Sequence, residues 1–312
     1  MGRKRTNFRV SSNSNCNGCI DHVNVWFISG VSRRSSKFTN KIVYLQGKVY
    51  YCSEPIKKSA YMDAAQKILV EEYVVPTYHV DFDWKITVPN LLLLLQEAAW
   101  KHANQHGFGY SHLQEKGTFW VLAKLKLVMY CYPCWRDTLR IETWGKAPEL
   151  LTAFRDFEGF DQQGNKLFAA TSAWHILSIS GNRPQSMELF KNAFPIAEGR
   201  HAIEEKPAKI PAAKNPQQTL PAAVLPSDID MNLHVNNTRY VQWILDHFDF
   251  EFLQQHQLKE MEVNFLSQAK MGDCYVITSG ALSNNEFISS VLRDGDQKEL
   301  ARVRTLWAVR EA

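Results

Sequence analysis

The residues that could do chemistry in this chain are concentrated just after position 227. Asp228, Asp230, Asn232 and His234 alternate there with apolar residues. An extended backbone would turn all four polar side chains to one side. The pattern therefore predicts either a polar site or a capped turn.

An amphipathic helix is predicted to follow this polar run. From Val235 to Phe248 apolar residues recur at spacings of three and four, which is typical of a helix with one buried face. Asn236 and Asn237 are good N-cap residues, so the helix should begin at one of them. The first N–H groups of a helix have no partner within it, so a carbonyl oxygen placed there would be polarised. For each polar residue alone, the alternative is that it only caps a buried helix.

The whole run resembles a known signature. Asp-x-Asp-x-Asn-x-His-Val-Asn-Asn-x-x-Tyr, from Asp228 to Tyr240, is similar to the motif of acyl-acyl carrier protein (acyl-ACP) thioesterases. The resemblance covers roughly residues 67 to 310. It implies an α+β fold of two tandem hot-dog domains, each with a long helix wrapped by an antiparallel sheet. It also implies that the chain hydrolyses fatty acyl-ACP, releases free fatty acid and so terminates chain elongation.

Thioester hydrolysis needs a placed water, a group that takes its proton and donors for the developing oxyanion. His234 is the expected base because imidazole titrates near neutral pH. Asn232 would orient the water or stabilise the oxyanion, and Asp230 would hold Asn232 or His234 in place. The alternative for His234 is a buried histidine that caps the helix. The expected oxyanion donors, which would contact the substrate, are the backbone N–H groups of Val235, Asn236 and Asn237.

One position departs from the family pattern. Matching the Gly272-Asp273 end of the next strand puts Gln268 where the family has a glutamate. Glutamine cannot take a proton, although its amide can hold a water, so Gln268 is expected to position the water. The next residue, a cysteine in plant members, is Ala269, which argues against a Cys-His-Asn mechanism. Two alternatives to acyl-ACP hydrolysis follow: the same chemistry on acyl-CoA, and an inactive relative that only binds acyl chains.

An internal repeat divides the chain into two similar halves. A constant offset of 147 residues aligns two aspartates, a valine and an asparagine of the first half with the polar run. At this offset Lys85 lies opposite Asn232 and Thr87 lies opposite His234. Only the second half is therefore expected to be catalytic.

Each half shows a helix followed by alternating strands. The first helix is expected from Leu91 to about Gln105, with strands following to Ser178, and the second half has the same order up to Arg310. Polar turns at 162–165 and 294–296 are typical of hairpins. This order predicts an α+β fold, in which the second sheet continues the first.

A proline-rich segment separates the halves. Six prolines lie between positions 195 and 226, a density that disfavours helix and central strand. An extended crossover is expected there, after a short helix near Met187 to Ala193. The expected domains are a first hot-dog with the acyl tunnel at 67–190, a linker at 191–218 and a catalytic hot-dog at 219–312.

The resemblance implies that the acyl chain enters a tunnel in the first half, although the same residues would fit an ordinary core. The expected lining is Leu92, Leu95 and Ala99 on the helix, with strand residues between Phe119 and Leu125, Trp120 among them. Since ACP is acidic, a basic patch is also implied, and the lysines and arginines between 200 and 214 are the candidates.

A basic leader accounts for the positive charge of the chain. Residues 1–61 carry eleven Lys or Arg and two acids, a charge of +9, so the remainder carries −5 of the total of +4. An acidic body does not favour a nucleic-acid partner. The leader has three interpretations: a transit peptide, an over-extended reading frame with Met62 as the true start, or a disordered basic tail. The second is favoured and implies a cytoplasmic protein, whereas a transit peptide would imply the plastid stroma.

Cysteine content and hydropathy set further expectations. Six cysteines are too few for a disulfide scaffold in 312 residues, and they fit a reducing compartment. Two Cys-x-x-Cys pairs, Cys16/Cys19 and Cys131/Cys134, could together bind zinc, but the second pair interrupts strands, and no metal or cofactor is expected. No apolar run approaches the roughly 18 residues of a membrane span. A homodimer is among the expectations.

Overall fold

A computed structural model describes residues 19–20, 38–45, 48–55, 67–181, 183–190 and 194–310. The chain divides into two compact units, Met1–Asp63 and Ala64–Ala312. In the first unit, β1 (Cys19–Ile20), β2 (Phe38–Leu45) and β3 (Lys48–Pro55) form an antiparallel sheet in the order β1-β3-β2. The rest of the leader, with Cys16, lies outside the described residues, and the interpretations of the leader stay predictions.

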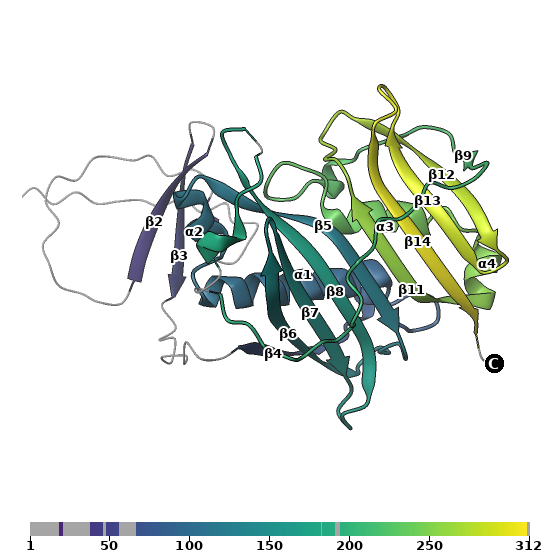
Figure 1. Cartoon of the computed structure of the whole chain (residues 1–312), viewed down its shortest axis with the longest axis horizontal. Coiled ribbons are helices and arrows are strands. Elements are labelled where there is room, and N and C mark those ends of the chain that lie inside the picture. The colour runs from purple at the N-terminus through teal and green to yellow at the C-terminus, as the bar shows by residue number, and fades with distance from the viewer. Residues whose placement is uncertain are drawn as a thin grey trace, which may run out of the picture. The chain divides into compact units, whose positions relative to one another are not determined.

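The second unit is built on one large antiparallel sheet (Figure 1). Its order is β10-β12-β13-β14-β11-β5-β8-β7-β6-β4, and β9 also pairs with β12. The strands of the first half are β4 (Ile68–Val74), β5 (Thr118–Met129), β6 (Thr138–Glu149), β7 (Thr152–Phe160) and β8 (Lys166–Ser178). Those that follow are β9 (Gln217–Gln218), β10 (Ala222–Ala223), β11 (His256–Phe265), β12 (Cys274–Ser283), β13 (Glu286–Arg293) and β14 (Glu299–Val309). The predicted α+β class and the continuous sheet are confirmed.

The sheet has an internal two-fold repeat about its centre. β5 and β11 pair antiparallel there, with Leu125 opposite Val263. Outwards from this pair, the order β8, β7, β6, β4 on one side matches β14, β13, β12, β10 on the other. Helices α1 (Val88–Gln105) and α3 (Asn237–Leu245) contact each other. Their buried residues belong to one hydrophobic core with strands of both halves.

The first long helix begins three residues before the predicted Leu91. Thr87 is its N-cap, and the Thr87 hydroxyl accepts the Asn90 N–H at 3.3 Å. Pro89 lies in the first turn, where its missing N–H has no cost. The helix ends at Gln105 as predicted, before Gly107 with φ +76°. Short helices α2 (Tyr110–Glu115) and α4 (Phe250–Gln255) occupy matching places in the two halves.

The crossover runs over the sheet as an extended segment (Figure 1). Trp144 Nε1–H donates to the Arg200 carbonyl at 3.1 Å, and Asn264 Nδ2–H donates to the Ala208 carbonyl at 2.9 Å. These bonds attach the segment to strands of both halves. The short helix expected before it is a 3-10 turn, η2 (Met187–Phe190), and residues 191–193 lie outside the described part.

No helix in the described part of the chain is long and apolar enough to cross a bilayer. No group of three or more His, Cys, Asp or Glu side chains there could hold a metal ion. Cys131 and Cys134 lie between β5 and β6 as free thiols.

Candidate active site

The polar run forms a tight turn, which agrees with the capped-turn alternative and not with an extended backbone. The Asp230 N–H donates to the His234 carbonyl at 2.8 Å, and the Leu233 N–H donates to the Asp230 carbonyl at 3.0 Å. Leu233 has φ +62°. Asp230 Oδ1 accepts the Asn232 N–H at 2.8 Å. Aspartate side chains favour such turns because they bond nearby backbone N–H groups, and this local bonding replaces the alternation of a strand.

The four polar side chains differ in burial and in partners. Asp228 is buried, and its Oδ2 accepts the Leu225 N–H at 2.8 Å, so this residue caps the 3-10 turn η3 (Pro226–Asp228). Asp230 and His234 are half-buried, and Asn232 is exposed. The imidazole of His234 therefore reaches the surface, as a base that must meet water requires.

The start of α3 agrees with the prediction, but the oxyanion donors only partly do. Asn236 is the N-cap, and its Oδ1 accepts the Thr238 N–H at 3.0 Å. The Val235 N–H donates to the Ala269 carbonyl, and the Asn236 N–H donates to the Asp228 carbonyl, both at 2.9 Å. These two N–H groups are used within the protein and are excluded as oxyanion donors. The following N–H, that of Asn237, has no acceptor among the hydrogen bonds of the described residues.

A loop after β11 brings Gln268 close to this turn. β11 ends at Phe265, so the predicted strand does not extend to Gln268. Gln268 is exposed, whereas its neighbour Ala269 is buried. The Ala269 carbonyl accepts the N–H of Val235, the residue directly after His234. The structure thus brings the backbones of His234 and Gln268 together.

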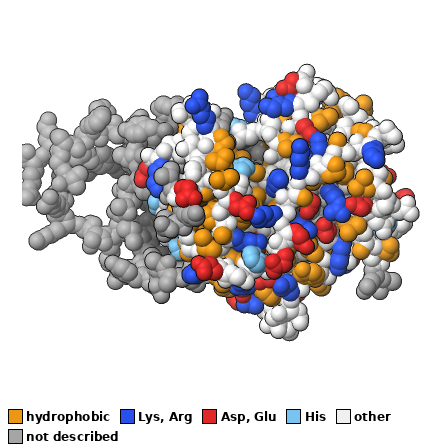
Figure 2. Space-filling model, in the orientation of Figure 1, with side chains coloured by type: hydrophobic (Ala, Val, Ile, Leu, Met, Phe, Trp, Pro, Cys, Tyr) orange, Lys and Arg blue, Asp and Glu red, His pale blue; other side chains and the backbone are white. Residues whose placement is uncertain are grey.

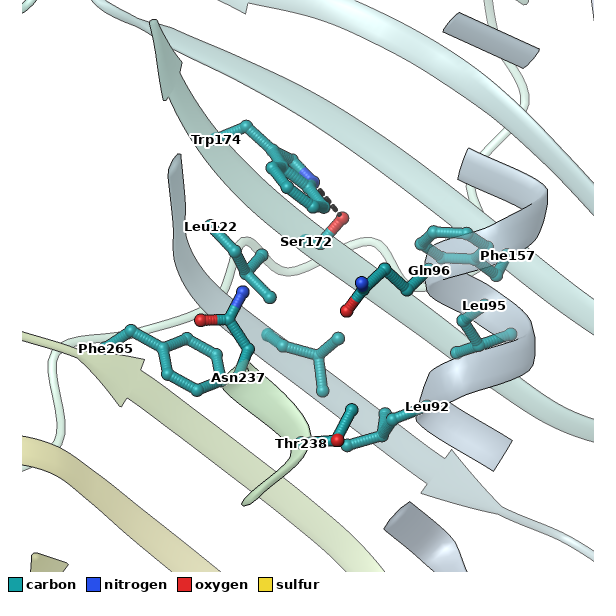
Figure 3. A pocket seen from close by; sticks show the side chains of 11 residues that line it. Leu92, Leu95, Gln96, Leu122, Phe157, Ser172, Trp174, Asn237, Thr238 and Phe265 are labelled. Carbon is teal, nitrogen blue, oxygen red and sulfur yellow. Dashed lines mark hydrogen bonds between the residues drawn. The ribbon is translucent and has the colours of Figure 1, made fainter. Parts of the chain in front are cut away.

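A pocket opens at the first turn of α3 and extends between α1 and the sheet of the first half (Figure 3). Its cavity volume is about 30 Å³, within about 410 Å³ of space between the lining atoms that includes open solvent. Figure 3 shows Asn237 and Thr238 at the α3 end, with Leu92 and Leu95 along α1. The other lining residues are Gln96, Leu122, Leu125, Phe157, Ser172, Trp174 and Phe265. A mostly apolar lining with a few polar groups suits a hydrocarbon chain that ends in a polar head.

Two expected lining residues lie elsewhere. Ala99 is buried in the core, and Trp120 donates its Nε1–H to the Phe108 carbonyl at 3.0 Å beside a separate small core cluster. A bulge in β5 between Leu122 and Lys124 shifts the strand. As a result Leu122 and Leu125 line the same pocket although they are three residues apart.

Several lining residues were missed in the sequence analysis. Gln96 follows Leu92 by one helical turn, so the helical period could have indicated it. Phe157, Ser172 and Trp174 come from β7 and β8, and only the pairing register places them beside the pocket. His234 and Gln268 do not line the pocket. The turn that carries His234 leads directly into Asn237, which does.

The hydrogen bonds of the two halves correct the repeat offset from 147 to 149. The Asp81 N–H donates to the Lys85 carbonyl at 2.9 Å, as the Asp230 N–H does to the His234 carbonyl. Trp84, with φ +60°, turns the first-half loop as Leu233 turns the second. Asp81 therefore corresponds to Asp230, which lies 149 positions later in the chain.

The first-half loop lacks the Asn/His pair at the corrected positions. Lys85 replaces His234 and Asp83 replaces Asn232, and these two form an ion pair at 2.7 Å. Arg310 also pairs with Asp83. Of the two loops, the second is therefore the one with an imidazole, the candidate base.

Comparisons with known proteins give one result. The family model "Acyl-ACP thioesterase N-terminal domain" matches residues 66–189, and "Acyl-ACP thioesterase C-terminal domain" matches residues 212–309. Oleoyl-acyl carrier protein thioesterase 1, chloroplastic, of Arabidopsis thaliana is 28% identical over 76% of this chain and 75% of its own length. The Coriandrum sativum oleoyl-acyl carrier protein thioesterase is 27% identical over 65% of this chain and 60% of its own.

Solved structures agree with the sequence relatives. An acyl-ACP thioesterase from Bacteroides thetaiotaomicron superposes with a TM-score of 0.73 at 28% identity, covering 79% of this chain and 100% of that one. The 12:0-ACP thioesterase from Umbellularia californica superposes with a TM-score of 0.68 at 21% identity, covering 78% and 98%. At that identity the second match shows the fold alone.

Proposed function

The chain belongs to the acyl-ACP thioesterase family, and on that premise we propose that it hydrolyses fatty acyl-ACP and releases the free fatty acid. One observation carries the proposal: the apolar pocket begins at the helix end that follows His234 directly. A fatty acyl chain in this pocket would bring its thioester to the start of α3. Each methylene group buried there would contribute about 0.8 kcal/mol to binding.

Asn237 at the pocket, together with the turn that precedes it and the nearby Gln268, suggests the steps of the reaction. The thioester oxygen would accept the Asn237 N–H, where the helix dipole favours negative charge. His234 takes a proton from a water held by the Gln268 amide, the water oxygen adds to the carbonyl carbon, and Asn232 orients this water. The carbon–sulfur bond then breaks, and the leaving thiolate takes the proton from His234.

The expected docking patch for ACP is partly neutralised. Arg200 pairs with Glu142 at 2.7 Å and with Glu158 at 2.5 Å, and Lys206 pairs with Glu149. On the face in Figure 2 acidic and basic side chains are interspersed. Within the proposal, the exposed Lys209 and Lys214 of the crossover remain the candidates for contact with the acidic carrier.

The proposal also covers the cellular location of the protein and its oligomeric state. Six cysteines in 312 residues suit a reducing compartment, and we propose the cytoplasm, with the plastid stroma as the alternative. The chloroplast location is that of the plant relatives. A homodimer stays a prediction, and light scattering on the purified protein tests it.

Thiol release from acyl-ACP by the purified full chain tests the proposed function. The substitution His234→Ala should lower kcat by at least about 100-fold, because general-base catalysis contributes a factor of that size. His247→Ala is the matched control, since His247 is exposed and lies past the end of α3. Its kcat should equal that of the wild type. Equal rates for wild type and His234→Ala would contradict the proposed base.

Two further measurements separate the rival functions. A higher kcat/KM on acyl-CoA than on acyl-ACP of equal chain length would favour the CoA thioester as substrate. The variant Gln268→Glu distinguishes an acyl-binding relative from a hydrolase. We expect its rate to stay within a few-fold of an active wild type. Activity that appears only in Gln268→Glu would instead favour the acyl-binding function.

A further inference from the structure

The peptide that joins Gln268 to Ala269 is held at both of its polar atoms. Its N–H, from Ala269, donates to the Tyr240 hydroxyl at 2.8 Å. Its carbonyl, from Gln268, accepts from Arg293 NH2 at 2.9 Å. The next carbonyl, that of Ala269, accepts the Val235 N–H at 2.9 Å. Three hydrogen bonds thus hold two successive residues against α3 and the end of β13.

The partners of this peptide are themselves well fixed. Tyr240 is only 2% exposed and packs edge-on against Trp243 and Phe265, at centroid distances of 5.4 and 6.3 Å. Burial raises the pKa of Tyr240 to about 12, so its hydroxyl stays neutral near pH 7. Arg293 is three-quarters buried, and its Nε lies 3.3 Å from Asp273 Oδ2, although without hydrogen-bond geometry. A peptide plane bound to such partners at both edges cannot rotate freely.

The first half has the same loop contact without this arrangement. The Ile86 N–H donates to the Pro133 carbonyl at 2.9 Å, as the Val235 N–H does to Ala269. Proline has no N–H to donate. The helix residue that matches Tyr240 is Leu91, which has no hydroxyl. The hydrogen bond from this peptide N–H to a helix hydroxyl therefore exists in the half that has His234. In the half that has Lys85, both the donor and the acceptor are missing.

We propose that Tyr240 and Arg293 are positioning residues that act through the Gln268–Ala269 peptide to aim the Gln268 amide at the water beside His234. This inference rests on the proposed function. Gln268 is exposed, and among the described residues its hydrogen bond is made by its backbone carbonyl, so its backbone sets the region that the amide can reach. The Val235 bond places this backbone beside His234, and the peptide bonds set the direction of the side chain. A displacement of about 1 Å in such a site can cost about 100-fold in rate.

Removal of each end of one hydrogen bond tests the proposal. Tyr240→Phe deletes the acceptor and keeps the packed ring, and Ala269→Pro deletes the donor by copying Pro133 of the first half. Each should lower kcat on acyl-ACP about 10- to 100-fold with KM within about twofold, because the acyl pocket is unchanged. The double variant should be no slower than the single ones, since both remove the same bond. The matched control is Tyr275→Phe, whose ring stacks on Trp243 at 3.9 Å, and its kcat should equal that of the wild type.

A second comparison tests whether the loss of kcat in Tyr240→Phe depends on the Gln268 side chain. In the Gln268→Ala background, Tyr240→Phe should change kcat by less than about twofold, because the amide that it positions is already gone. A purely structural role would give the same loss in both backgrounds and would overturn the proposal. Arg293→Met provides an independent variant at the carbonyl end, with the same expectation if Tyr240→Phe fails to fold.

The controls separate this inference from the proposed function. A wild type with no thioesterase activity, or one equal to His234→Ala, contradicts the proposed function itself. A wild type that is active and depends on His234, but whose kcat is unchanged in Tyr240→Phe and Arg293→Met, contradicts only the positioning role. Circular dichroism at the assay temperature establishes that each variant is folded.

Discussion

His234 and Lys85 stand at matching positions of the two halves, and only one of them can serve as a base. Lys85 is an ammonium bound to Asp83 at 2.7 Å, so it has no lone pair for a proton of water. His234 is half-buried in a turn whose backbone is held by Asp230. The two loops therefore differ at two matching positions, 83/232 and 85/234. The loop with Asp83 and Lys85 is structural, and the loop with Asn232 and His234 is the candidate catalytic one.

At the same scale, the Asn237 N–H can be removed without breaking the helix. Asn237 is the first residue of α3, where proline is tolerated, and Asn236 has ψ 139°, which suits a residue before proline. The kcat of Asn237→Pro should lie about 100- to 1,000-fold below that of Asn237→Ala, as expected for loss of an oxyanion donor. Steady-state kinetics on acyl-ACP measure this ratio.

The Asn237→Ala variant separates the side chain from the N–H, because it keeps the backbone donor. Thermal unfolding of both variants shows whether the helix start is intact. Similar kcat values for the two variants would exclude the Asn237 N–H as the oxyanion donor.

At the scale of elements, the crossover is fastened to the sheet by an ionic network. The Arg200 guanidinium lies 3.9 Å from the centroid of the Trp144 ring and bridges Glu142 and Glu158. Lys166 also donates to Glu158, at 2.5 Å. Burial raises the pKa of Glu158, but the hydrogen bonds from Lys166 and Arg200 outweigh it, so the pKa lies below its usual 4.5.

This lowered pKa predicts how stability depends on pH. A carboxyl group whose pKa is lower in the folded state stabilises the fold above its unfolded pKa, near 4.5, and loses this contribution as the pH falls through the folded pKa. Glu158→Gln should reduce the free energy of unfolding by about 1–3 kcal/mol at pH 7. Its stability should also fall less steeply than that of the wild type on acidification.

Urea denaturation at a series of pH values measures both effects. Glu251→Gln is the control, since Glu251 is exposed on α4, and its curve should follow that of the wild type. Parallel curves for Glu158→Gln and wild type would show that Glu158 does not contribute through its ionisation.

At the scale of the whole described body, Arg310 makes contacts with both halves. Its Nε–H donates to the carbonyls of Leu253 and His256, both at 3.0 Å, in the second half. The same guanidinium pairs with Asp83 and lies 5.2 Å from the Phe82 ring centroid in the first half. The loop of the first half is thus pinned to the end of β14.

Removal of the Arg310 side chain should lower stability and leave catalysis unchanged. Arg310→Ala should lower the free energy of unfolding by about 1–3 kcal/mol, because charge-assisted hydrogen bonds of a largely buried arginine are lost. The kcat/KM on acyl-ACP, measured where the variant is folded, should equal that of the wild type. Lys259→Ala, at an exposed position, should change neither quantity. A drop in kcat/KM of Arg310→Ala would instead link the first-half loop to the reaction.

Much of the architecture follows from local pattern. The start of α3 was predicted because an N-cap asparagine before an apolar stripe is a signal carried by adjacent residues. The α+β order and the continuous sheet were predicted for the same reason, since helix and strand periods repeat along the chain. Leu92 and Leu95, which the family resemblance implied as lining residues, both line the pocket.

Contacts between distant residues decided the rest. The turn at Asp230, the offset of 149 and the use of the Val235 N–H by Ala269 depend on hydrogen bonds that spacing does not encode. Trp120 packs edge-on against the lining residue Trp174 and donates to the Phe108 carbonyl, whereas Phe157 lies in the lining because the strand register places it there. Residue types and their order were thus sufficient for most of the elements and for naming His234 as the candidate base, whereas the pocket and the peptide that holds Gln268 exist only once the strands pair.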